Sequence, residues 1–388
     1  MIPVVARQYV SKQDLLALKD ANEKVAWEEE RRSSSYNHAM PVHLTLETTM
    51  VCNLRCVMCQ VFRSPETIQR AGVADSVMPL ELFEKIAREA FPAAKEMTPT
   101  VMGEPLLTPY LSRILEVLAE YSMKMNLVTS GMHLSPEISA RIIPHLRKIK
   151  VSFDGATKPT FEAIRRGAEF ERVIENVRQF NTARQKLAPR ERPILAFQVT
   201  LMRRNIEELP TIVELAAELG VDEVIGLHVY VFDKDFESQS LLHHKELSDT
   251  IIREAVEKAK PLGVYPHFPA PFSREEDDLP SAEMPRGPPR LCKFLWREVW
   301  VSHTGDVTPC CVPDRPVMGN LRTSTLAEIW NGPLYKEMRS RLGTDDPYDC
   351  CRHCSLATQY EKGLGNDYDE KRFFLYEKTA DPGPANSS

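Results

Sequence analysis

The sequence lacks the long apolar runs that mark membrane and secreted proteins. No stretch approaches the roughly 20 apolar residues that a spanning helix needs, and residues 1–13 contain no apolar core of a signal peptide. Basic residues are not clustered, and a formal charge of −6 over 388 residues gives no sign of a nucleic-acid surface. These absences predict a cytoplasmic protein with no membrane or nucleic-acid partner.

Cysteine is missing from the whole interval between Cys59 and Cys292. All nine cysteines fall into two groups, at residues 52–59 and 292–354. A disulfide framework would distribute them along the chain, whereas two metal sites would cluster them in this way. A reducing compartment also keeps such thiols available as ligands. We therefore expect two metal sites.

From residue 42 onward, short apolar segments alternate with amphipathic ones. The predicted strands cover residues 42–49, 98–103, 124–129, 148–153, 194–201 and 223–231. The predicted helices cover residues 79–91, 110–121, 135–145, 170–187, 206–219 and 243–260. This alternation is typical of parallel βαβ units. Six units without an obvious seventh and eighth predict an α/β fold, a partial (β/α)6 barrel like an incomplete TIM barrel, with its chemistry at the carboxyl ends of the strands.

The composition divides the chain into five parts. A helical extension is predicted over residues 1–40, with a helix at 11–32 that Ser11 caps. The barrel follows at 41–240, and a helix with a proline-rich extended connector occupies 241–290. A small α+β cysteine module covers 291–362, and the tail at 363–388 is predicted to be partly disordered, above all after Ala380.

Cys52, Cys56 and Cys59 form a C-x3-C-x2-C motif directly after the first predicted strand. Three thiolates on one short loop can bind three irons of a four-iron cluster and leave the fourth iron open. An open iron can bind a small molecule through its amine and carboxylate and transfer an electron to it. A zinc site is the alternative, although zinc usually takes paired C-x2-C units, and the first spacer here is longer.

The motif resembles that of the radical S-adenosylmethionine (SAM) superfamily, in which the cluster reduces SAM and releases a 5′-deoxyadenosyl radical. The resemblance implies SAM and a 4Fe-4S cluster as cofactors. It extends to Gly103-Glu104-Pro105 after the second predicted strand, where relatives bind the amino group of SAM through a Gly-Gly-Glu or Gly-Glu-Pro run. Met102 replaces the first glycine of the commoner version.

Four further residues are candidates for cofactor binding, Ser130, Ser152 and Met58 by their positions in the same resemblance and Gln198 by its place on a strand. Ser130 lies in Thr-Ser-Gly where relatives often carry Thr-Asn-Gly, and Ser152 would contact the ribose or carboxylate of SAM. Gln198 alternates with apolar neighbours on the fifth predicted strand and is expected to line the site. Met58 takes the place of an aromatic residue that stacks on adenine, and its thioether can pack on a purine face.

Three residues are candidates for catalysis. Asp154, in a Ser-x-Asp-Gly run, would face the substrate and serve as a base, and His228 is the other candidate base. A lone histidine is more often structural, so this alternative stays open for His228. Cys311 adjoins a predicted ligand and is either an ordinary buried thiol or a hydrogen-atom donor of the kind that radical epimerases require.

The second cysteine group has the form C-x12-G-x4-C followed by C-x2-C, with a predicted hairpin turn at residues 304–306 and a predicted helix at 325–342. It resembles the SPASM and twitch domains that bind auxiliary iron–sulfur clusters. No cysteine follows Cys354, so the shorter twitch form is expected, with one auxiliary 4Fe-4S cluster on Cys292, Cys310, Cys351 and Cys354. Zinc is the alternative metal, and Cys350 is a spare thiol.

These features predict a radical SAM oxidoreductase that takes an electron from an external reductant such as flavodoxin or ferredoxin. The substrate is expected to be a small molecule, and the reaction the dehydrogenation of a sugar or aminocyclitol alcohol with the auxiliary cluster as electron acceptor. The alternatives are a radical epimerase or a peptide-modifying enzyme, although about forty residues before the barrel are few for a leader-binding domain. An iron–sulfur electron carrier is an alternative of another class.

Overall fold

The computed structural model of the protein describes residues 11–63, 76–273, 292–312, 314–352 and 354. Its strands form one ten-stranded sheet in the order β10-β9-β8-β1-β2-β3-β4-β5-β6-β7. Neighbouring strands from β1 to β7 pair in parallel. The strands are β1 (His43–Leu46), β2 (Glu96–Thr98), β3 (Lys124–Thr129), β4 (Leu146–Ser152), β5 (Ile194–Leu201), β6 (Glu223–His228), β7 (Tyr265–His267), β8 (Glu298–Val301), β9 (Asp306–Thr308) and β10 (Gly319–Asn320).

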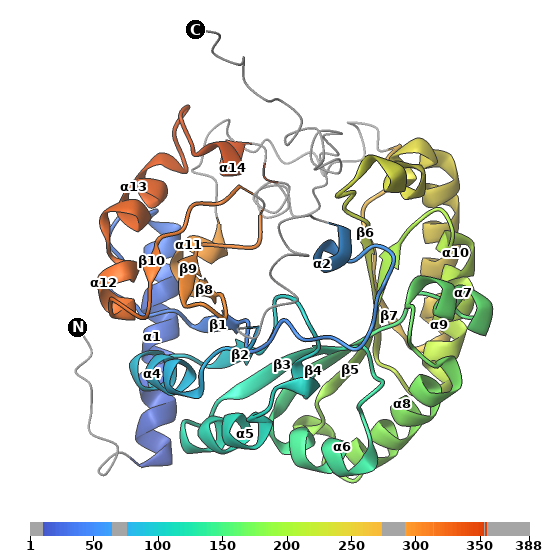
Figure 1. The fold of residues 1–388 in the computed structure, drawn as a ribbon, viewed down its shortest axis with the longest axis horizontal. Coiled ribbons are helices and arrows are strands. Elements are labelled where there is room, and N and C mark those ends of the chain that lie inside the picture. The colour runs from blue at the N-terminus through green and yellow to red at the C-terminus, as the bar shows by residue number, and fades with distance from the viewer. Residues whose placement is uncertain (1–10, 64–75, 274–291, 313, 353, 355–388) are drawn as a thin grey trace, which may run out of the picture.

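The sheet is curved, and helices α4 to α10 cover its outer face (Figure 1). Such a layer arrangement follows from parallel βαβ connections, which return each strand to the same sheet through a helix. The helices are α1 (Lys12–Arg31), α2 (Gln60–Arg63), α4 (Leu80–Ala90), α5 (Leu111–Glu120), α6 (Pro136–Ile142), α7 (Lys158–Ile164), α8 (Phe170–Arg184), α9 (Leu209–Glu218), α10 (Lys245–Leu262), α11 (Lys293–Arg297), α12 (Leu326–Trp330), α13 (Pro333–Arg341) and α14 (Asp349–Arg352).

The two faces of the sheet differ in polarity. On β4, Ile149 and Val151 are fully buried under the outer helices, whereas Lys148, Lys150 and Ser152 alternate with them. Because side chains point to opposite faces along a strand, the basic and hydroxyl side chains of β4 lie on the inner face. The outer face therefore forms the apolar core, and the inner face is available for polar chemistry.

The C-terminal module is built into the same sheet. Its first strand, β8, pairs in parallel with β1, so that His43 lies beside Glu298, and the β8–β9 hairpin continues the sheet as antiparallel strands. The segment before β1 also contacts this module, since the Trp330 indole donates to the carbonyl of Ala39 (2.9 Å) and the Trp296 indole donates to a carbonyl of the same segment. The module therefore contacts both β1 and the segment that precedes it.

The predicted α/β class with a largely parallel sheet is confirmed. The predicted helix at residues 325–342 is wrong in one respect, because it divides into α12 and α13 at Gly332 and Pro333. The connector after α10 was expected to be unpacked, yet residues 265–267 form β7 beside β6. The tail after residue 354 and most of the connector lie outside the described residues. Within the described ranges, no helix is long and apolar enough to cross a membrane.

Candidate active site

A cavity of about 730 Å³ opens along the inner face of the sheet. All three cysteines of the first motif line it, together with side chains from β1 to β5, from β8 and from α11. Its position at the carboxyl ends of parallel strands is where active sites of βα barrels lie. The first cysteine loop and the inner face of the barrel therefore line one cavity.

The cysteine loop is held from the side of α7. The Arg165 guanidinium donates a hydrogen bond to Cys56 Sγ at 3.8 Å, and the backbone N–H of Leu54 donates to Cys52 Sγ at 3.4 Å. Burial raises the pKa of the Cys56 thiol to about 11, while the charge of Arg165 opposes that rise. Metal binding requires the thiolate form, so the cation beside Cys56 favours it. Three thiols directed at one cavity, with a cation beside them, fit an iron–sulfur cluster.

Asp154 holds that arginine in place. Its carboxylate is fully buried and forms an ion pair with the Arg165 guanidinium at 2.7 Å, and it accepts a hydrogen bond from the backbone N–H of Thr200 at 2.6 Å. Burial raises the pKa of Asp154, and the neighbouring guanidinium counteracts this. Asp154 is not among the described residues that line the cavity. Its geometry is that of a positioning residue for the cysteine loop, and its role as a base stays a prediction.

Gly103 and Glu104 fix the approach of the second strand to the cysteine loop. Gly103 has φ +82°, and a Cβ at this position would lie 2.5 Å from the carbonyl oxygen of Thr49. The buried Glu104 carboxylate accepts hydrogen bonds from the Thr129 hydroxyl (2.7 Å) and from both the N–H (2.8 Å) and hydroxyl (2.7 Å) of Ser130. Glu104 therefore ties the ends of β2 and β3 together, and both Gly103 and Glu104 line the cavity.

The other predicted cofactor residues divide into two sets. Ser130, Ser152 and Gln198 line the cavity, and Ser152 lies directly beside Gln198 in the pairing of β4 with β5. Met58 instead packs against a small apolar cluster that includes Val57. The contacts of all four with SAM stay predictions.

His228 and Cys311 lie apart from this cavity in the described part of the chain. The His228 ring packs 4.8 Å from the Phe272 ring, and burial lowers the pKa of His228 to about 4. A buried imidazole with that pKa is neutral at physiological pH. Cys311 is exposed, whereas its neighbour Cys310 is buried. The catalytic roles assigned to His228 and Cys311 stay predictions.

A second, small cavity gathers the C-terminal cysteines. Apolar side chains, among them Leu295 and Met338, form the rest of its wall. Burial raises the pKa of Cys292 to about 12, and a metal that binds such a thiol would displace its proton. The cysteines of this cavity are Cys292, Cys310, Cys350, Cys351 and Cys354. Five sulfurs in an apolar pocket fit an iron–sulfur cluster, and Cys350 lies among them although it was treated as a spare.

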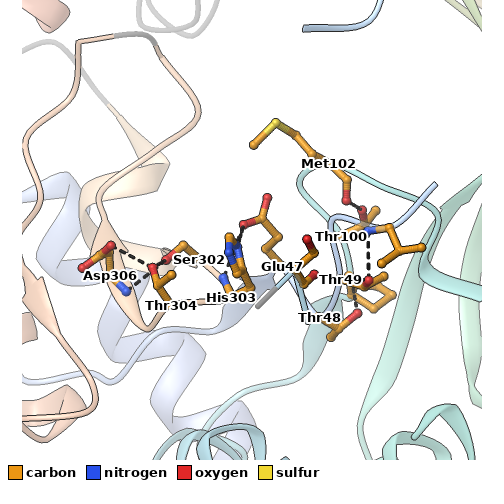
Figure 2. Close-up of polar contacts among 12 residues, drawn as sticks. Glu47, Thr48, Thr49, Thr100, Met102, Ser302, His303, Thr304 and Asp306 are labelled. Atoms are coloured by element: carbon orange, nitrogen blue, oxygen red, sulfur yellow. Dashed lines mark hydrogen bonds and ion pairs between the residues drawn. The ribbon is translucent and has the colours of Figure 1, made fainter. Parts of the chain in front are cut away.

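A buried hydrogen bond between Glu47 and His303 joins the two modules at the end of β1 (Figure 2). Glu47 Oε2 lies 2.7 Å from His303 Nδ1 and also accepts from the backbone N–H of His303 at 3.3 Å. Next to it, the Thr48 hydroxyl donates to the carbonyl of Pro99 at 2.7 Å. The hairpin on one side and the β2 loop on the other thus clamp the residues that lead into the cysteine loop. Sequence reasoning missed this pair because its members are 256 positions apart.

Sequence reasoning also missed the charged inner wall of the cavity. The lining includes His43, Glu96, Lys150, Lys293 and Glu298. The signal was present in β4, where charged and apolar residues alternate, but an alternating strand usually faces solvent with its polar side. Only the curvature of the sheet turns that side inward.

Comparisons with known proteins agree with this geometry. Residues 46–216 match the family model described as the radical SAM superfamily, and residues 292–355 match SPASM, an iron–sulfur cluster-binding domain. The chain is 22% identical over 357 residues to the antilisterial bacteriocin subtilosin biosynthesis protein AlbA of Bacillus subtilis, covering 89% of this chain and 73% of AlbA. It is 23% identical over 325 residues to the PqqA peptide cyclase of Granulibacter bethesdensis, covering 81% and 79%.

Among solved structures, Streptococcus suis SuiB bound to its precursor peptide SuiA has a similar fold. The TM-score is 0.56 at 16% identity, over 84% of this chain and 72% of SuiB. At 16% identity the likeness shows a shared fold and nothing more. That SuiB structure contains the bound precursor peptide SuiA.

Proposed function

This chain belongs to the radical SAM superfamily and carries a C-terminal SPASM domain, and from that we propose that it oxidatively modifies a peptide. Its cofactors are SAM and iron–sulfur clusters, one bound by the barrel and the other by the SPASM domain. The observation that carries the proposal is the pair of cysteine-lined cavities, one large and polar, the other small and apolar, within a single sheet.

The cofactors supply the one-electron chemistry that removes an unactivated hydrogen atom, and the protein supplies binding and orientation. Cys52, Cys56 and Cys59 would hold the barrel cluster, with Arg165 keeping a positive charge at Cys56 Sγ. The close approach of Gly103 to the backbone before Cys52 fixes the loop against the second strand.

The second cavity would account for an oxidative direction of the proposed reaction. Cys292, Cys310, Cys351 and Cys354 would hold an auxiliary cluster, and Cys350 faces the same cavity. Such a cluster would supply an acceptor for one electron from the substrate. We infer one auxiliary cluster, because these five sulfurs surround a single small cavity.

A peptide substrate is supported by the relatives, whose names describe a bacteriocin biosynthesis protein and a peptide cyclase, and by the precursor peptide bound to SuiB. The dehydrogenation of a sugar or aminocyclitol is the second candidate. It is favoured by the charged inner wall, and a volume of about 730 Å³ lies within the usual range of small-ligand sites, about 300–1,000 Å³. An electron carrier would need no such cavity.

The test is anaerobic reconstitution with iron and sulfide, followed by SAM and dithionite and an assay for 5′-deoxyadenosine. About eight irons per chain are expected for two four-iron clusters. Cys56→Ala should abolish deoxyadenosine and lose about half of the iron. Cys310→Ala should lose a similar amount of iron, while Cys311→Ser, as the matched control, should retain it. A fully loaded protein that forms no deoxyadenosine, with or without added peptides, would support the carrier instead.

The two substrate classes can be separated in the same assay. A pool of peptides and a panel of sugars and aminocyclitols are added separately, and the yield of deoxyadenosine is compared with the yield without substrate. The proposal expects stimulation by peptides. Stimulation by the sugar panel alone would establish the second candidate.

A further inference from the structure

Lys150 lies on the inner face of β4, two positions before Ser152, and both line the large cavity. Its neighbours in the sheet are Val128 on β3 and Ala196 on β5. Neither side chain can accept a hydrogen bond. The strands on both sides therefore leave the Lys150 ammonium group facing the cavity without a polar partner of their own.

The two lysines nearest in charge to Lys150 are paired. The Lys148 ammonium forms an ion pair with the Glu223 carboxylate, and Lys293 with Glu298 at 2.7 Å. Within the described ranges, no residue forms a hydrogen bond or ion pair with the Lys150 ammonium. Of these three lysines, Lys150 alone has no carboxylate within hydrogen-bond or ion-pair distance in the described residues.

An ammonium group without a partner in a largely buried position is unfavourable. Burial lowers the pKa of Lys150, repulsion from Lys148 and Lys293 lowers it further, and attraction to Glu223 opposes the shift only in part. Such a group costs stability, and proteins retain costly charges where function needs them. A ligand with one negative charge would compensate it, whereas a dianion would bring excess negative charge into the same wall.

We propose that Lys150 binds a carboxylate group of the substrate inside the barrel. This inference rests on the proposed peptide-modifying function and specifies it: the peptide presents an acidic residue to Lys150. Because residues two apart on a strand are separated by about 6.6 Å, Lys150 lies one layer deeper than Ser152 and Gln198. The carboxylate is thus held below the level of the predicted SAM contacts, and the carbon that reacts is directed towards them.

The test uses two probes that differ only in charge, N-acetyl-glutamate N-methylamide and N-acetyl-glutamine N-methylamide. Each is titrated into the full-length, cluster-loaded protein with SAM and no reductant, and dissociation constants are measured by ligand-observed NMR. The acid is expected to bind more tightly than the amide. Lys150→Met should weaken binding of the acid about tenfold or more, since it removes a charged hydrogen bond, and should leave the amide unchanged. Lys150→Arg should stay within about threefold of wild type because the charge is kept.

Lys158→Met is the matched control, because Lys158 is an exposed lysine that pairs with Glu171 outside the cavity. Equal binding of acid and amide by the wild type would overturn the inference, as would an equal loss in the Lys158 variant. Inorganic phosphate that competes better than the acid would overturn the assignment to a monoanion.

Two further measurements separate the inference from the proposed function. Lys150→Met should raise the urea midpoint of unfolding, because it replaces an uncompensated charge by an apolar side chain, whereas a lysine with a structural role would give a lower midpoint. Glucuronate that binds through Lys150 more tightly than the glutamate probe would support the carboxylate site and overturn its assignment to a peptide. Absence of deoxyadenosine from the wild type would overturn the proposed function, while the binding data would still decide the role of Lys150.

Discussion

Replacement of Gly103 by alanine should disturb the cysteine loop from a distance. At φ +82° a side chain occupies the left-handed region, which costs roughly 1–2 kcal/mol for a residue other than glycine. The new Cβ would also lie 2.5 Å from the carbonyl oxygen of Thr49 and less than 3.0 Å from two backbone atoms of Met50. These neighbours are backbone atoms and cannot rotate away. Relief requires that the segment leading to Cys52 moves.

The expected loss has two parts. The backbone conformation accounts for about 1–2 kcal/mol. The overpacking adds about 1–3 kcal/mol, the usual cost of atoms inserted into a packed core. Gly103→Ala should therefore lower the free energy of unfolding by about 2–5 kcal/mol. Because Cys52 shifts with the loop, the variant should also bind less iron at the barrel site.

Gly263→Ala is a matched control. Gly263 also has positive φ, +69°, at the end of α10, but no atom of the described residues lies within 4 Å of the position that a Cβ would take there. This variant should lower the free energy of unfolding only by the cost of the backbone conformation, about 1–2 kcal/mol, and should bind iron as the wild type does. Urea unfolding followed by circular dichroism gives the stabilities, and iron analysis after identical reconstitution gives the loading. If both variants lose the same stability and bind the same iron, the close approach of Gly103 has no role in holding the loop.

Three further predictions concern buried polar groups. His303→Ala removes the imidazole that lies 2.7 Å from the buried Glu47 carboxylate and keeps the backbone N–H that donates to the same oxygen, so urea unfolding should show a loss of about 1–3 kcal/mol; an unchanged free energy of unfolding would contradict a stabilising role of this contact. Arg165→Met leaves Asp154 buried without its cation and Cys56 without its donor, so iron analysis should show less iron at the barrel site, and full loading would contradict the role given to this pair. The pKa of His228 is lowered to about 4 in the folded protein, so its neutral form contributes stability above pH 6.5 that is lost as the pH falls; between pH 7 and 5.5 the wild type should lose about 1 kcal/mol more than His228→Phe, and parallel pH profiles would contradict this.

The parts of the fold that were predicted correctly depend on local signals. Strands β3 and β5 have the predicted bounds, because each is a short run of apolar alternation ended by polar residues. The C-x3-C-x2-C loop is equally local, since its spacing alone specifies three ligands. The break between α12 and α13 was also local: Pro333 cannot continue a helix from the preceding turn, and its signal was overlooked.

The remaining features depend on contacts between distant parts of the chain. The pairing of β8 with β1 and the hydrogen bond between Glu47 and His303 join segments that no spacing rule connects. Spacing likewise does not determine whether Cys350 or Cys351 is the cluster ligand, because the two are adjacent in the sequence. In the structure their sulfurs lie 4.0 Å apart and line the same cavity. The lack of a partner at Lys150 emerges only when the ion pairs of the neighbouring lysines, Lys148 and Lys293, are known in three dimensions.

The pairing of β8 with β1 has a consequence for synthesis of the protein. His43 and its partner Glu298 are 255 positions apart, so at about 5–20 residues per second the ribosome needs roughly 13–50 seconds to deliver the second strand after the first. During that time one edge of β1 carries unpaired backbone groups, which readily pair with other chains. A nascent chain that stops before β8 would keep this edge open and become a substrate for chaperones or aggregation. The cluster-binding module therefore also covers the edge of β1 against pairing with other chains.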